Sequence, residues 1–277
     1  MIRRVKTIIF LNERPLYEFE MYFNPILQKL QRKEPVYGSM IDEISNPLVI
    51  QLLSKAGFDF VVVDMEHGVF TVREIVNFTL AAKNCPIAII VRTPGKDPQI
   101  ISKILDCGAH GIMIPHVETK AEVQGIIHAS KYHPIGNRGY GPRGIITDYD
   151  AMGCDEKIRI INDNVVIWIQ IESEVAIEKL DMLLSFPEIN GVVIGPMDLS
   201  VSMGILGQTH DIRVHQAFQK VLTFCNQKGV PCGIHFKDLA KSKEWKSKGM
   251  NICLYSTTFE LLLEKSKKDL TELKDSK

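Results

Sequence analysis

Polar and ionisable side chains follow several short apolar runs of this chain, at the point where each run ends. The run Val165–Ile169 leads into Gln170 and Glu172, and the run Val192–Ile194 leads into Asp198. Buried parallel strands read as nearly continuous Val and Ile. Polar groups at the carboxyl ends of such strands assemble the active site of an α/β barrel. The pattern therefore predicts an enzyme whose chemistry gathers on one rim of a barrel.

Two carboxylates, Glu172 and Asp198, are the strongest candidates for a metal site. Adjacent barrel strands would bring both within reach of one cation. Two carboxylates completed by water and substrate suit Mg²⁺ or Mn²⁺, and zinc suits them less well because no His or Cys is tied to the pair by a motif. Alternatively, each carboxylate caps the helix that follows it. The pattern alone leaves both interpretations open.

A histidine and an arginine stand at two further strand ends. His67, next to Glu66, could serve as a general base near neutral pH, or it could be a loop histidine that only binds backbone. Arg92 could clamp a carboxylate or stabilise an enolate oxygen. Its alternative is a structural salt bridge with Asp64 or Glu66. His116 and His235 also stand at strand ends and are weaker candidates.

Two glycine-containing segments could bind anions. Residues 195–198 read as a tight turn whose backbone N–H groups could bind a carboxylate, or as an ordinary turn. Residues 136–144 are rich in Gly and Arg but lack the Gly-Lys-Ser/Thr ending of a phosphate-binding loop. This second loop could carry an arginine to an anionic substrate, or it could form a subunit contact.

Composition narrows the class of protein. Lys plus Arg number 33 and Asp plus Glu number 33, so the chain has no formal net charge to favour nucleic acid or a membrane surface. No apolar run approaches the roughly 18 residues needed to span a bilayer, and the first apolar stretch is too short for a secretory signal. The six cysteines are scattered. We expect reduced thiols in a cytoplasmic protein.

Strand and helix patterns alternate along most of the chain. Strands are predicted at 36–41, 58–64, 87–91, 111–114, 165–169, 191–194, 230–235 and 251–255, and helices at 25–32, 47–55, 72–84, 97–106, 120–132, 156–162, 174–184, 211–228, 238–248 and 258–268. Eight strand–helix units predict an α/β fold, a single (β/α)8 TIM barrel over 24–277 behind a short N-terminal extension, 1–23. A doubly wound sheet is disfavoured because no Gly-x-Gly-x-x-Gly follows the first strand. The Lys-rich tail from Lys265 reads as a helix end followed by solvated charge.

Taken together, these motifs resemble the HpcH/HpaI aldolase and citrate lyase family over residues 24–265. The motifs that carry the resemblance, in their shared order, are Gly57-Phe58-Asp59 with Asp64-Met65-Glu66-His67, Val91-Arg92 with Asp97-Pro98, Ile104–Ala109, Gly111–Pro115 with Val117-Glu118-Thr119, Tyr132-His133-Pro134 with Arg138-Gly139, Gln170-Ile171-Glu172, and Gly195–Ser200. The resemblance is greatest to the class II, metal-dependent 2-keto-4-hydroxyacid aldolases, such as 4-hydroxy-2-oxoheptanedioate aldolase or 2-dehydro-3-deoxyglucarate aldolase.

The resemblance implies a role for each candidate residue. The catalytic residues would be His67, Asp106 and Arg92, with Asp106 orienting His67. The metal ligands would be Glu172 and Asp198. The substrate-binding residues would be Arg92, Gln170, Gly195, Met197 and Asp198. Asp106 is added by the resemblance alone, because it otherwise reads as a charge at a helix end.

The resemblance also implies an activity and partners. A divalent cation (Mg²⁺, Mn²⁺ or Co²⁺) would assist reversible cleavage of a 2-keto-4-hydroxy acid to pyruvate, or a close 2-keto acid, and an aldehyde. Such enzymes form homo-oligomers, hexamers or trimers of dimers, whose neighbouring subunits complete the site. The chain departs from the family pattern at two places, and both bear on substrate specificity. Met197 stands where a smaller residue is common, and 145–152 lacks the usual Ala/Arg-rich stretch. The alternatives are a lyase acting on a CoA thioester and a non-catalytic barrel that binds keto acids.

Overall fold

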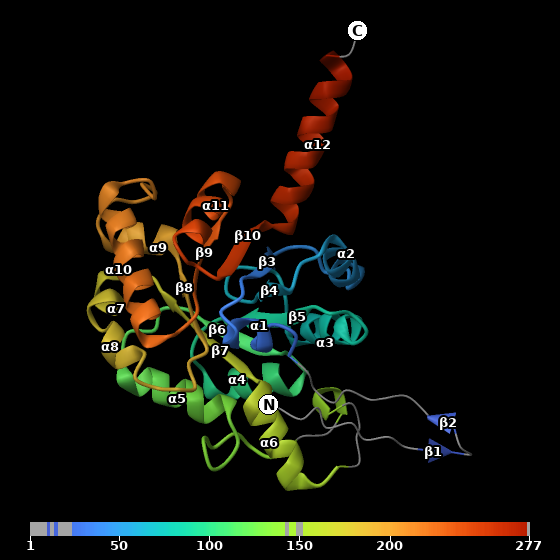
Figure 1. Ribbon diagram of the computed structural model, residues 1–277. Helices are drawn as coiled ribbons and strands as arrows, with labels where there is room; N and C mark the ends of the chain where they lie inside the picture. Colours follow the sequence, from blue (N-terminus) through green and yellow to red (C-terminus); the bar gives the residue numbers. More distant parts are fainter. Residues whose placement is uncertain (1–9, 12–13, 16–23, 142–143, 148–151, 276–277) are drawn as a thin grey trace.

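Eight parallel strands close into a barrel at the centre of the protein (Figure 1). The computed structural model describes residues 10–11, 14–15, 24–141, 144–147 and 152–275. The strands follow one another around the barrel in chain order, with β10 closing onto β3. They are β3 (Val36–Ile41), β4 (Phe60–Asp64), β5 (Ala88–Arg92), β6 (Gly111–Ile114), β7 (Val166–Ile171), β8 (Gly191–Ile194), β9 (Cys232–Phe236) and β10 (Ile252–Thr257). The predicted TIM barrel is confirmed.

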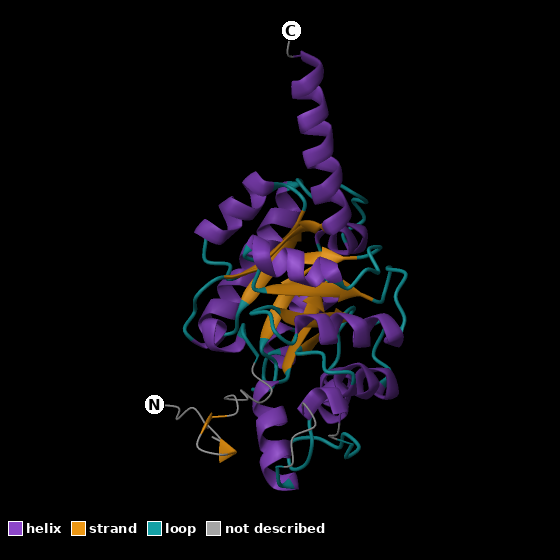
Figure 2. Ribbon diagram, turned by 90° about the vertical axis from the view of Figure 1, so that its right-hand side faces the viewer, coloured by secondary structure: helices purple, strands orange, loops and turns teal. Residues whose placement is uncertain are grey.

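Helices surround the barrel in the usual order of an α/β fold (Figure 2). They are α1 (Leu27–Gln31), α2 (Leu48–Ala56), α3 (Val72–Ala82), α4 (Pro98–Asp106), α5 (Lys120–Ser130), the 3₁₀ helix η1 (Gly144–Thr147), α6 (Cys154–Asn164), α7 (Glu174–Glu178), α8 (Leu180–Leu183), α9 (Pro196–Ser202), α10 (Ile212–Lys228), α11 (Leu239–Ser247) and α12 (Thr258–Asp275). Two further two-residue strands, β1 (Phe10–Leu11) and β2 (Arg14–Pro15), pair antiparallel within the N-terminal extension. Beyond those pairs the extension lies outside the described residues.

Local signals explain where several helices begin and end. Thr71 and Glu74 form a capping box at the start of α3, and Thr119 with Glu122 forms another at the start of α5. Helix α10 ends at Lys228 and is capped by Gly229, whose φ of 71° lies in the left-handed region that favours glycine. These start and stop signals are readable in the sequence, which is why most element boundaries agree with the predictions within two residues.

Successive strand residues alternate between two apolar layers. Phe60 and Val62 belong to the cluster inside the barrel, whereas Val61 and Val63 pack against the helices. The inside is filled by large side chains, including an edge-to-face pair of Phe60 and Trp168 with ring centroids 5.2 Å apart. The barrel is therefore a packed core, and its chemistry must lie at an open end.

Three predictions about elements are wrong in detail. The predicted helix 174–184 is two short helices, α7 and α8. The predicted turn at 195–198 is the start of helix α9, because Gly195 is the N-cap and Pro196 occupies the first helical position, where its missing N–H costs nothing. The Lys-rich tail stays helical to Asp275, and α12 projects away from the barrel (Figures 1 and 2). Among the described residues, no helix has the length and apolar content to cross a membrane.

Candidate active site

A pocket of about 460 Å³ opens at the carboxyl ends of the barrel strands. Its floor is the top of the barrel core, and its walls come from the last residue of β5 and from the segments that follow β4, β7, β8 and β9. The predicted site residues that line it are His67, Arg92, Gln170, Glu172, Gly195, Met197 and Asp198. Parallel strands end on the same rim, so side chains 26 positions apart in sequence, such as Glu172 and Asp198, meet in one place.

Arg92 forms the structural salt bridge that was the alternative to a substrate-binding role. It also lines the pocket. Its Nε donates to Asp64 Oδ1 at 2.8 Å and its Nη2 donates to Asp64 Oδ2 at 2.6 Å. Its Nη1 lies 3.2 Å from Glu66 Oε2. Burial tends to raise the pKa of Asp64, but the bonds and charge of Arg92 and the backbone N–H groups of His67 and Glu66 outweigh burial and lower that pKa. The guanidinium is thus fixed in place while it faces the pocket.

Glu172 is held by protein donors on both of its carboxylate oxygens. Gln170 Nε2 donates to Oε1 at 2.8 Å, and the backbone N–H of His116 donates to Oε2 at 3.0 Å. Burial raises the pKa of Glu172, and the negative charges of Asp198 and Glu66 raise it further, against the opposing effect of His116. The side chain is 2% exposed. An acidic group in this setting gains from a nearby cation.

Neither carboxylate caps a helix. Ser173 is the N-cap of α7, where its side chain accepts from the Ala176 N–H. Helix α9 begins at Gly195 without a side-chain cap, and Asp198 lies in its first turn. The capping interpretation of Glu172 and Asp198 is therefore wrong, and both carboxylates face the pocket.

Two residues outside the predicted site connect its members. His116 follows β6 with a φ of 54°, and its Nδ1 and Nε2 lie 3.2 Å from Glu172 Oε2 and 3.3 Å from Glu66 Oε1. Glu66 in turn contacts Arg92. A chain of contacts therefore runs from Glu172 to Arg92. The sequence places both residues just after apolar strands, but nothing in its pattern indicates the contacts between them.

His67 presents its ring at the mouth of the pocket. The side chain is 67% exposed, and Nε2 lies 3.9 Å from Glu66 Oε2. The backbone N–H of His67 donates to Asp64 Oδ1 at 3.3 Å, which ties the loop to the end of β4. The ring is therefore accessible to a bound molecule and to water.

Asp106 lies away from the other predicted site residues. It ends helix α4, which returns from the rim toward the start of β6, so about 12 Å of helix separates it from the carboxyl ends of the strands. Arg138 Nη2 donates to Asp106 Oδ1 at 2.5 Å. Within one chain Asp106 does not reach His67, so the predicted pairing of these two residues requires a second subunit.

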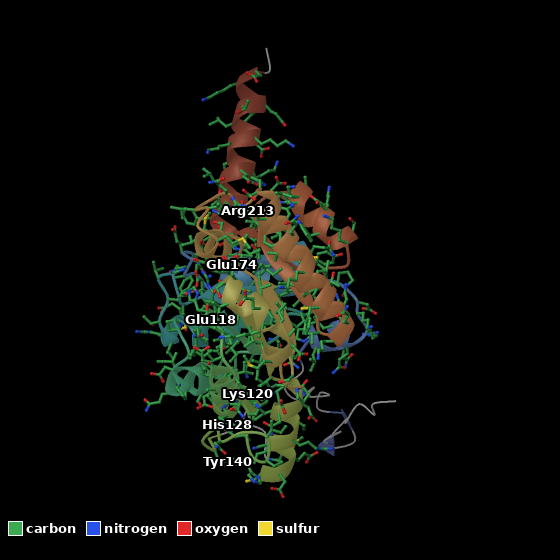
Figure 3. The ribbon with its side chains drawn as sticks, turned by 90° about the vertical axis from the view of Figure 1, so that its left-hand side faces the viewer. Glu118, Lys120, His128, Tyr140, Glu174 and Arg213 are labelled. Atoms are coloured by element: carbon green, nitrogen blue, oxygen red, sulfur yellow. The ribbon has the colours of Figure 1, made fainter. Side chains whose placement is uncertain are left out.

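The Gly/Arg-rich loop also lies at the end of the molecule opposite the pocket. Figure 3 shows Tyr140 far below Glu174 and Arg213, which lie toward the end from which α12 projects. Arg138 is buried and bound to Asp106 and to the Ser130 carbonyl. Arg138 therefore carries no charge to the pocket of its own chain, and Arg143 lies outside the described residues.

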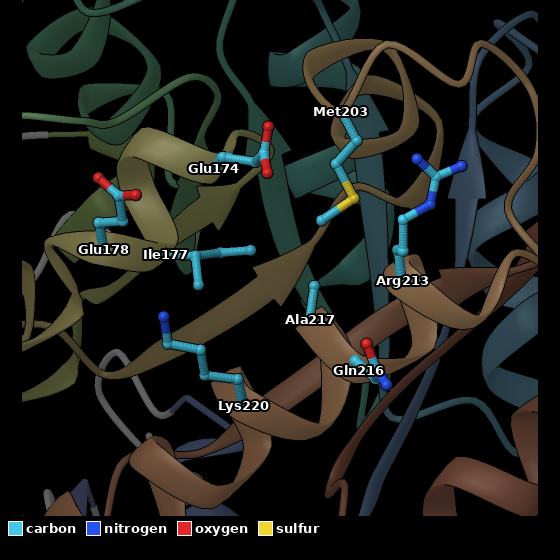
Figure 4. Close-up of a pocket in the computed structure, with 8 residues that line it drawn as sticks. All are labelled: Glu174, Ile177, Glu178, Met203, Arg213, Gln216, Ala217 and Lys220. Atoms are coloured by element: carbon cyan, nitrogen blue, oxygen red, sulfur yellow. The ribbon is translucent and has the colours of Figure 1, made fainter.

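A second pocket, of about 330 Å³, lies between α7 and α10 (Figure 4). Glu174, Glu178 and Lys220 line it together with Arg213. Arg213 is already paired with Asp211 through Nε and Nη2 at 3.0 and 2.8 Å. This pocket contains none of the predicted site residues.

The sequence profile of the HpcH/HpaI aldolase/citrate lyase family matches residues 43–262 of the chain. The chain belongs to the HpcH/HpaI aldolase/citrate lyase family. The matched segment runs from the loop after β3 into α12 and contains every residue of the predicted site. The prediction that the chain is an enzyme, a carbon–carbon lyase of this family, is confirmed.

Individual relatives agree with the family assignment. The chain is 32% identical to a 5-keto-4-deoxy-D-glucarate aldolase of Salmonella arizonae over 197 residues, which are 69% of this chain and 74% of that protein. Its fold matches an HpcH/HpaI aldolase from Desulfitobacterium hafniense with a TM-score of 0.85 and 32% identity, over 90% of this chain and 96% of that one. An HpcH/HpaI aldolase/citrate lyase family protein from Burkholderia cenocepacia matches with a TM-score of 0.85 and 26% identity, over 91% and 100%.

The HpcH/HpaI site of this chain has oxygen donors suited to a divalent cation. Among the described residues, no three His, Cys, Asp or Glu side chains converge as a ready metal cage. The described contacts also leave Gln170 Oε1 buried without a hydrogen-bond partner, beside the two carboxylates of the pocket. Oxygen donors that leave positions open for water and substrate fit Mg²⁺ or Mn²⁺. Glu172 and Asp198 would hold the ion, with Gln170 beside it.

Proposed function

We propose that the protein is a divalent-metal-dependent aldolase that reversibly cleaves a 2-keto-4-hydroxy acid to pyruvate, or a close 2-keto acid, and an aldehyde. The observation that carries this proposal is the meeting of Glu172, Asp198, Arg92 and His67 in one pocket. This set combines oxygen donors for a hard cation, a fixed positive charge and an accessible proton carrier. Metal-assisted retro-aldol cleavage uses the cation and the positive charge to stabilise the enolate, and the proton carrier to deprotonate the hydroxyl group.

The negative charge that develops during cleavage falls on the 2-oxo oxygen of the keto acid. Glu172 and Asp198 would hold a divalent cation, which would supply Lewis-acid stabilisation of that charge. Arg92 adds a fixed guanidinium, because its bidentate bond to Asp64 holds it on the rim. The backbone N–H of Met197, in the first turn of α9, binds the 1-carboxylate beside Gly195, whose own N–H already donates to the Ile171 carbonyl at 3.2 Å. These contacts orient C3 and C4 for cleavage of the bond between them.

Cleavage also requires removal of the proton from the 4-hydroxyl group. His67 takes this proton directly or through a water, because its ring is exposed at the pocket mouth. Asp106 of a neighbouring subunit orients the ring. Loss of the His67 side chain is expected to lower turnover by about 10²–10⁴-fold.

The substrate is a sugar-acid derivative or a similar 2-keto-4-hydroxy acid. The curated relative is named for 5-keto-4-deoxy-D-glucarate, and the pocket of about 460 Å³ has room for an aldehyde half beyond pyruvate. The barrel forms a homo-oligomer, which is supported by the exposed leucines of the projecting helix α12, such as Leu262 and Leu270.

The direct test is pyruvate release from a panel of 2-keto-4-hydroxy acids. Activity should disappear after chelation and return with Mg²⁺, Mn²⁺ or Co²⁺. Glu172→Gln should abolish the recovery of activity when metal is added back. Glu178→Gln, on the outer surface at α7, should not affect that recovery. Pyruvate release that persists in the chelated protein would remove the metal from the mechanism. Binding of keto acid and metal without any turnover would favour the non-catalytic alternative.

A further inference from the structure

His235 is a polar side chain at the floor of the active-site pocket that the proposed mechanism does not use. It is the last but one residue of β9 and lines the pocket. Cys232 and Ile234 of the same strand pack in the outer layer against the helices, so His235, next to Ile234, faces the inside of the barrel. Its partner in register on β10 is Leu254, a member of the inner cluster.

His235 and Arg92 lie on opposite sides of the barrel mouth. In the closed order of the eight strands, β5 and β9 are four strands apart, which is halfway around the ring. The alternate strands β3, β5, β7 and β9 supply Met40, Arg92, Gln170 and His235 to the pocket lining. A molecule held on the floor beside Arg92 and Gln170 therefore has His235 on its far side.

One ring nitrogen of His235 is already bound to the backbone. Nε2 lies 3.2 Å from the carbonyl oxygen of Ser256, and because a carbonyl oxygen only accepts, Nε2 is the donor. The same oxygen accepts from Ser39 Oγ at 3.3 Å. The ring is thus oriented by an acceptor that a second donor also holds, and Nδ1 is the nitrogen left for the pocket.

The surroundings of His235 keep its ring uncharged. Burial lowers the pKa of His235 to about 4, and the positive charges of Arg92 and Lys237 act in the same direction. The bond to the Ser256 carbonyl and the charge of Asp64 oppose this lowering without reversing it. A neutral imidazole with its hydrogen on Nε2 carries only a lone pair on Nδ1. Nδ1 therefore accepts from an O–H or N–H group and does not serve a carboxylate.

The protein supplies no donor to this lone pair. Among the residues that the structure describes, His235 Nδ1 has no hydrogen-bond partner. The inward side chains of the two neighbouring strands, Val193 of β8 and Leu254 of β10, are apolar. A ligand that displaces water from such an acceptor loses free energy unless it brings a donor of its own.

We propose that His235 Nδ1 accepts a hydrogen bond from a hydroxyl group on C3 of the keto acid, so that the preferred keto acid is a 3-hydroxy-2-keto acid of the hydroxypyruvate type. This inference rests on the proposed aldolase function, which puts the 2-oxo oxygen beside Arg92. The adjoining carbon, C3, then faces the far side of the floor, where His235 lies. His235 is a specificity residue in this arrangement, and His67 at the pocket mouth remains the proton carrier.

The equilibrium test compares two keto acids that differ in one group. 2-Oxobutanoate has a methyl group where hydroxypyruvate has its 3-hydroxyl, and the two groups are similar in size. Calorimetric titration with Mn²⁺ present should show that hydroxypyruvate binds about three- to tenfold more tightly, the effect of one hydrogen bond. Equal or weaker binding of hydroxypyruvate to the wild-type protein would overturn the inference.

Two variants assign the difference to His235. In His235→Gln the amide nitrogen can keep the bond to the Ser256 carbonyl, but no acceptor stands at the place of Nδ1, so the preference should disappear. His235→Asn puts an amide oxygen near that place and should keep part of the preference. His210→Gln, an exposed residue that lines the same pocket, is the matched control. A preference that persists in folded His235→Gln would show that the hydroxyl group binds elsewhere and would overturn the assignment.

Kinetic measurements separate this inference from the aldolase proposal. With one fixed aldehyde, KM for hydroxypyruvate should lie below KM for 2-oxobutanoate, and His235→Gln should remove the difference. Glycolaldehyde and propanal form the corresponding pair for the aldehyde half, and their KM ratio should be the same in the wild type and in His235→Gln. A change in the aldehyde ratio alone would overturn the assignment to C3. Absence of turnover with every aldehyde would overturn the aldolase, and the titration would still decide the role of His235.

Discussion

His116 contacts a single oxygen of Glu172 with two nitrogens. Its backbone N–H donates to Oε2 at 3.0 Å, and its ring Nδ1 lies 3.2 Å from the same atom. These two contacts depend on the φ of 54° at His116, which places its backbone N–H and its ring on the same side, toward Glu172. Histidine, asparagine and aspartate are the side-chain-bearing residues that tolerate this region best. His116 therefore orients the carboxylate proposed as a metal ligand.

Replacing His116 should weaken metal binding without unfolding the barrel. His116→Asn keeps the backbone conformation and the backbone N–H contact but removes the ring contacts to Glu172 and Glu66. Loss of a group that orients a ligand typically lowers metal affinity by about 10–100-fold. Titration with Mn²⁺ measures the change, and His128→Asn on the exposed surface of α5 is the control. An affinity equal to that of the wild type would exclude an orienting role.

The sequence predicts the barrel well because its strands are buried on both faces. Strands 111–114 and 191–194 were predicted with the bounds that the structure has, since glycine opens each apolar run and a polar segment or helix start closes it. The side chains at strand ends could be assigned to one rim because parallel strands share a direction. These inferences need only local patterns and one topological rule.

The contacts between loops could not be predicted in the same way. The link from Glu172 through His116 to Glu66 depends on a positive φ in one loop residue. The partner of Asp106 is Arg138, 32 positions later in a different loop. Each of these is set by tertiary contacts that no periodicity records.

A methyl group at position 195 should displace Glu172. A Cβ on Gly195 would overlap the Glu172 carboxylate, although the φ of −93° is one that any residue adopts. Gly195→Ala is therefore expected to lower Mn²⁺ affinity and turnover together while the Tm stays close to that of the wild type. The control is Gly125→Ala in α5, where a Cβ meets open space and should raise stability by about 1 kcal/mol. Full metal affinity in Gly195→Ala would show that Glu172 does not bind the ion from this position.

The ion pair of Asp64 and Arg92 should make the free energy of unfolding depend on pH in the acid range. The pKa of Asp64 is held below its ordinary value of 3.8, so the unfolded chain binds the proton more readily. The stabilisation is present above pH 3.8 and is lost as the pH falls below that value. Asp64→Asn should cost about 3 kcal/mol near neutral pH, because it removes the bidentate partner of the buried Arg92 and leaves only Glu66 opposite that guanidinium.

Denaturant unfolding at several pH values measures this difference. The gap between the wild type and Asp64→Asn should shrink on acidification. Asp269→Asn removes an exposed partner of Lys265 on α12 and should change little at any pH. A gap that stays constant down to pH 3 would mean that Asp64 keeps its ordinary pKa in the folded protein.

Mixing two impaired variants should test whether Asp106 serves His67 of another subunit. His67→Ala and Asp106→Asn would be purified separately, and Asn is chosen because it keeps a bond to the buried Arg138. After dissociation and joint reassembly, up to about a quarter of the sites in mixed oligomers would hold both native residues. Turnover should therefore rise above that of either variant alone. If the mixture is no more active than its components, Asp106 acts within its own subunit through Arg138 or has no catalytic role.

The projecting helix α12 should hold subunits together through one apolar stripe. The stripe consists of Phe259, Leu263, Leu270 and Leu273, with Ser266 between the two middle leucines. Successive positions in this series are four or three residues apart, which places them on one face of the helix. Each of these four side chains is between 45% and 71% exposed in the single chain. Apolar side chains repeated along one face of an isolated helix favour burial against a partner.

Charge placed in this stripe should therefore break the oligomer. The double variant Leu263→Glu with Leu270→Glu is expected to sediment as a smaller species than the wild type, because each glutamate would have to be desolvated in the contact. Thr271→Glu adds charge about 100° around the helix from Leu270 and should leave the mass unchanged. Because α12 barely contributes to the barrel core, the circular dichroism of the double variant should remain that of a folded barrel. A double variant that keeps the wild-type mass would place the subunit contact on another face.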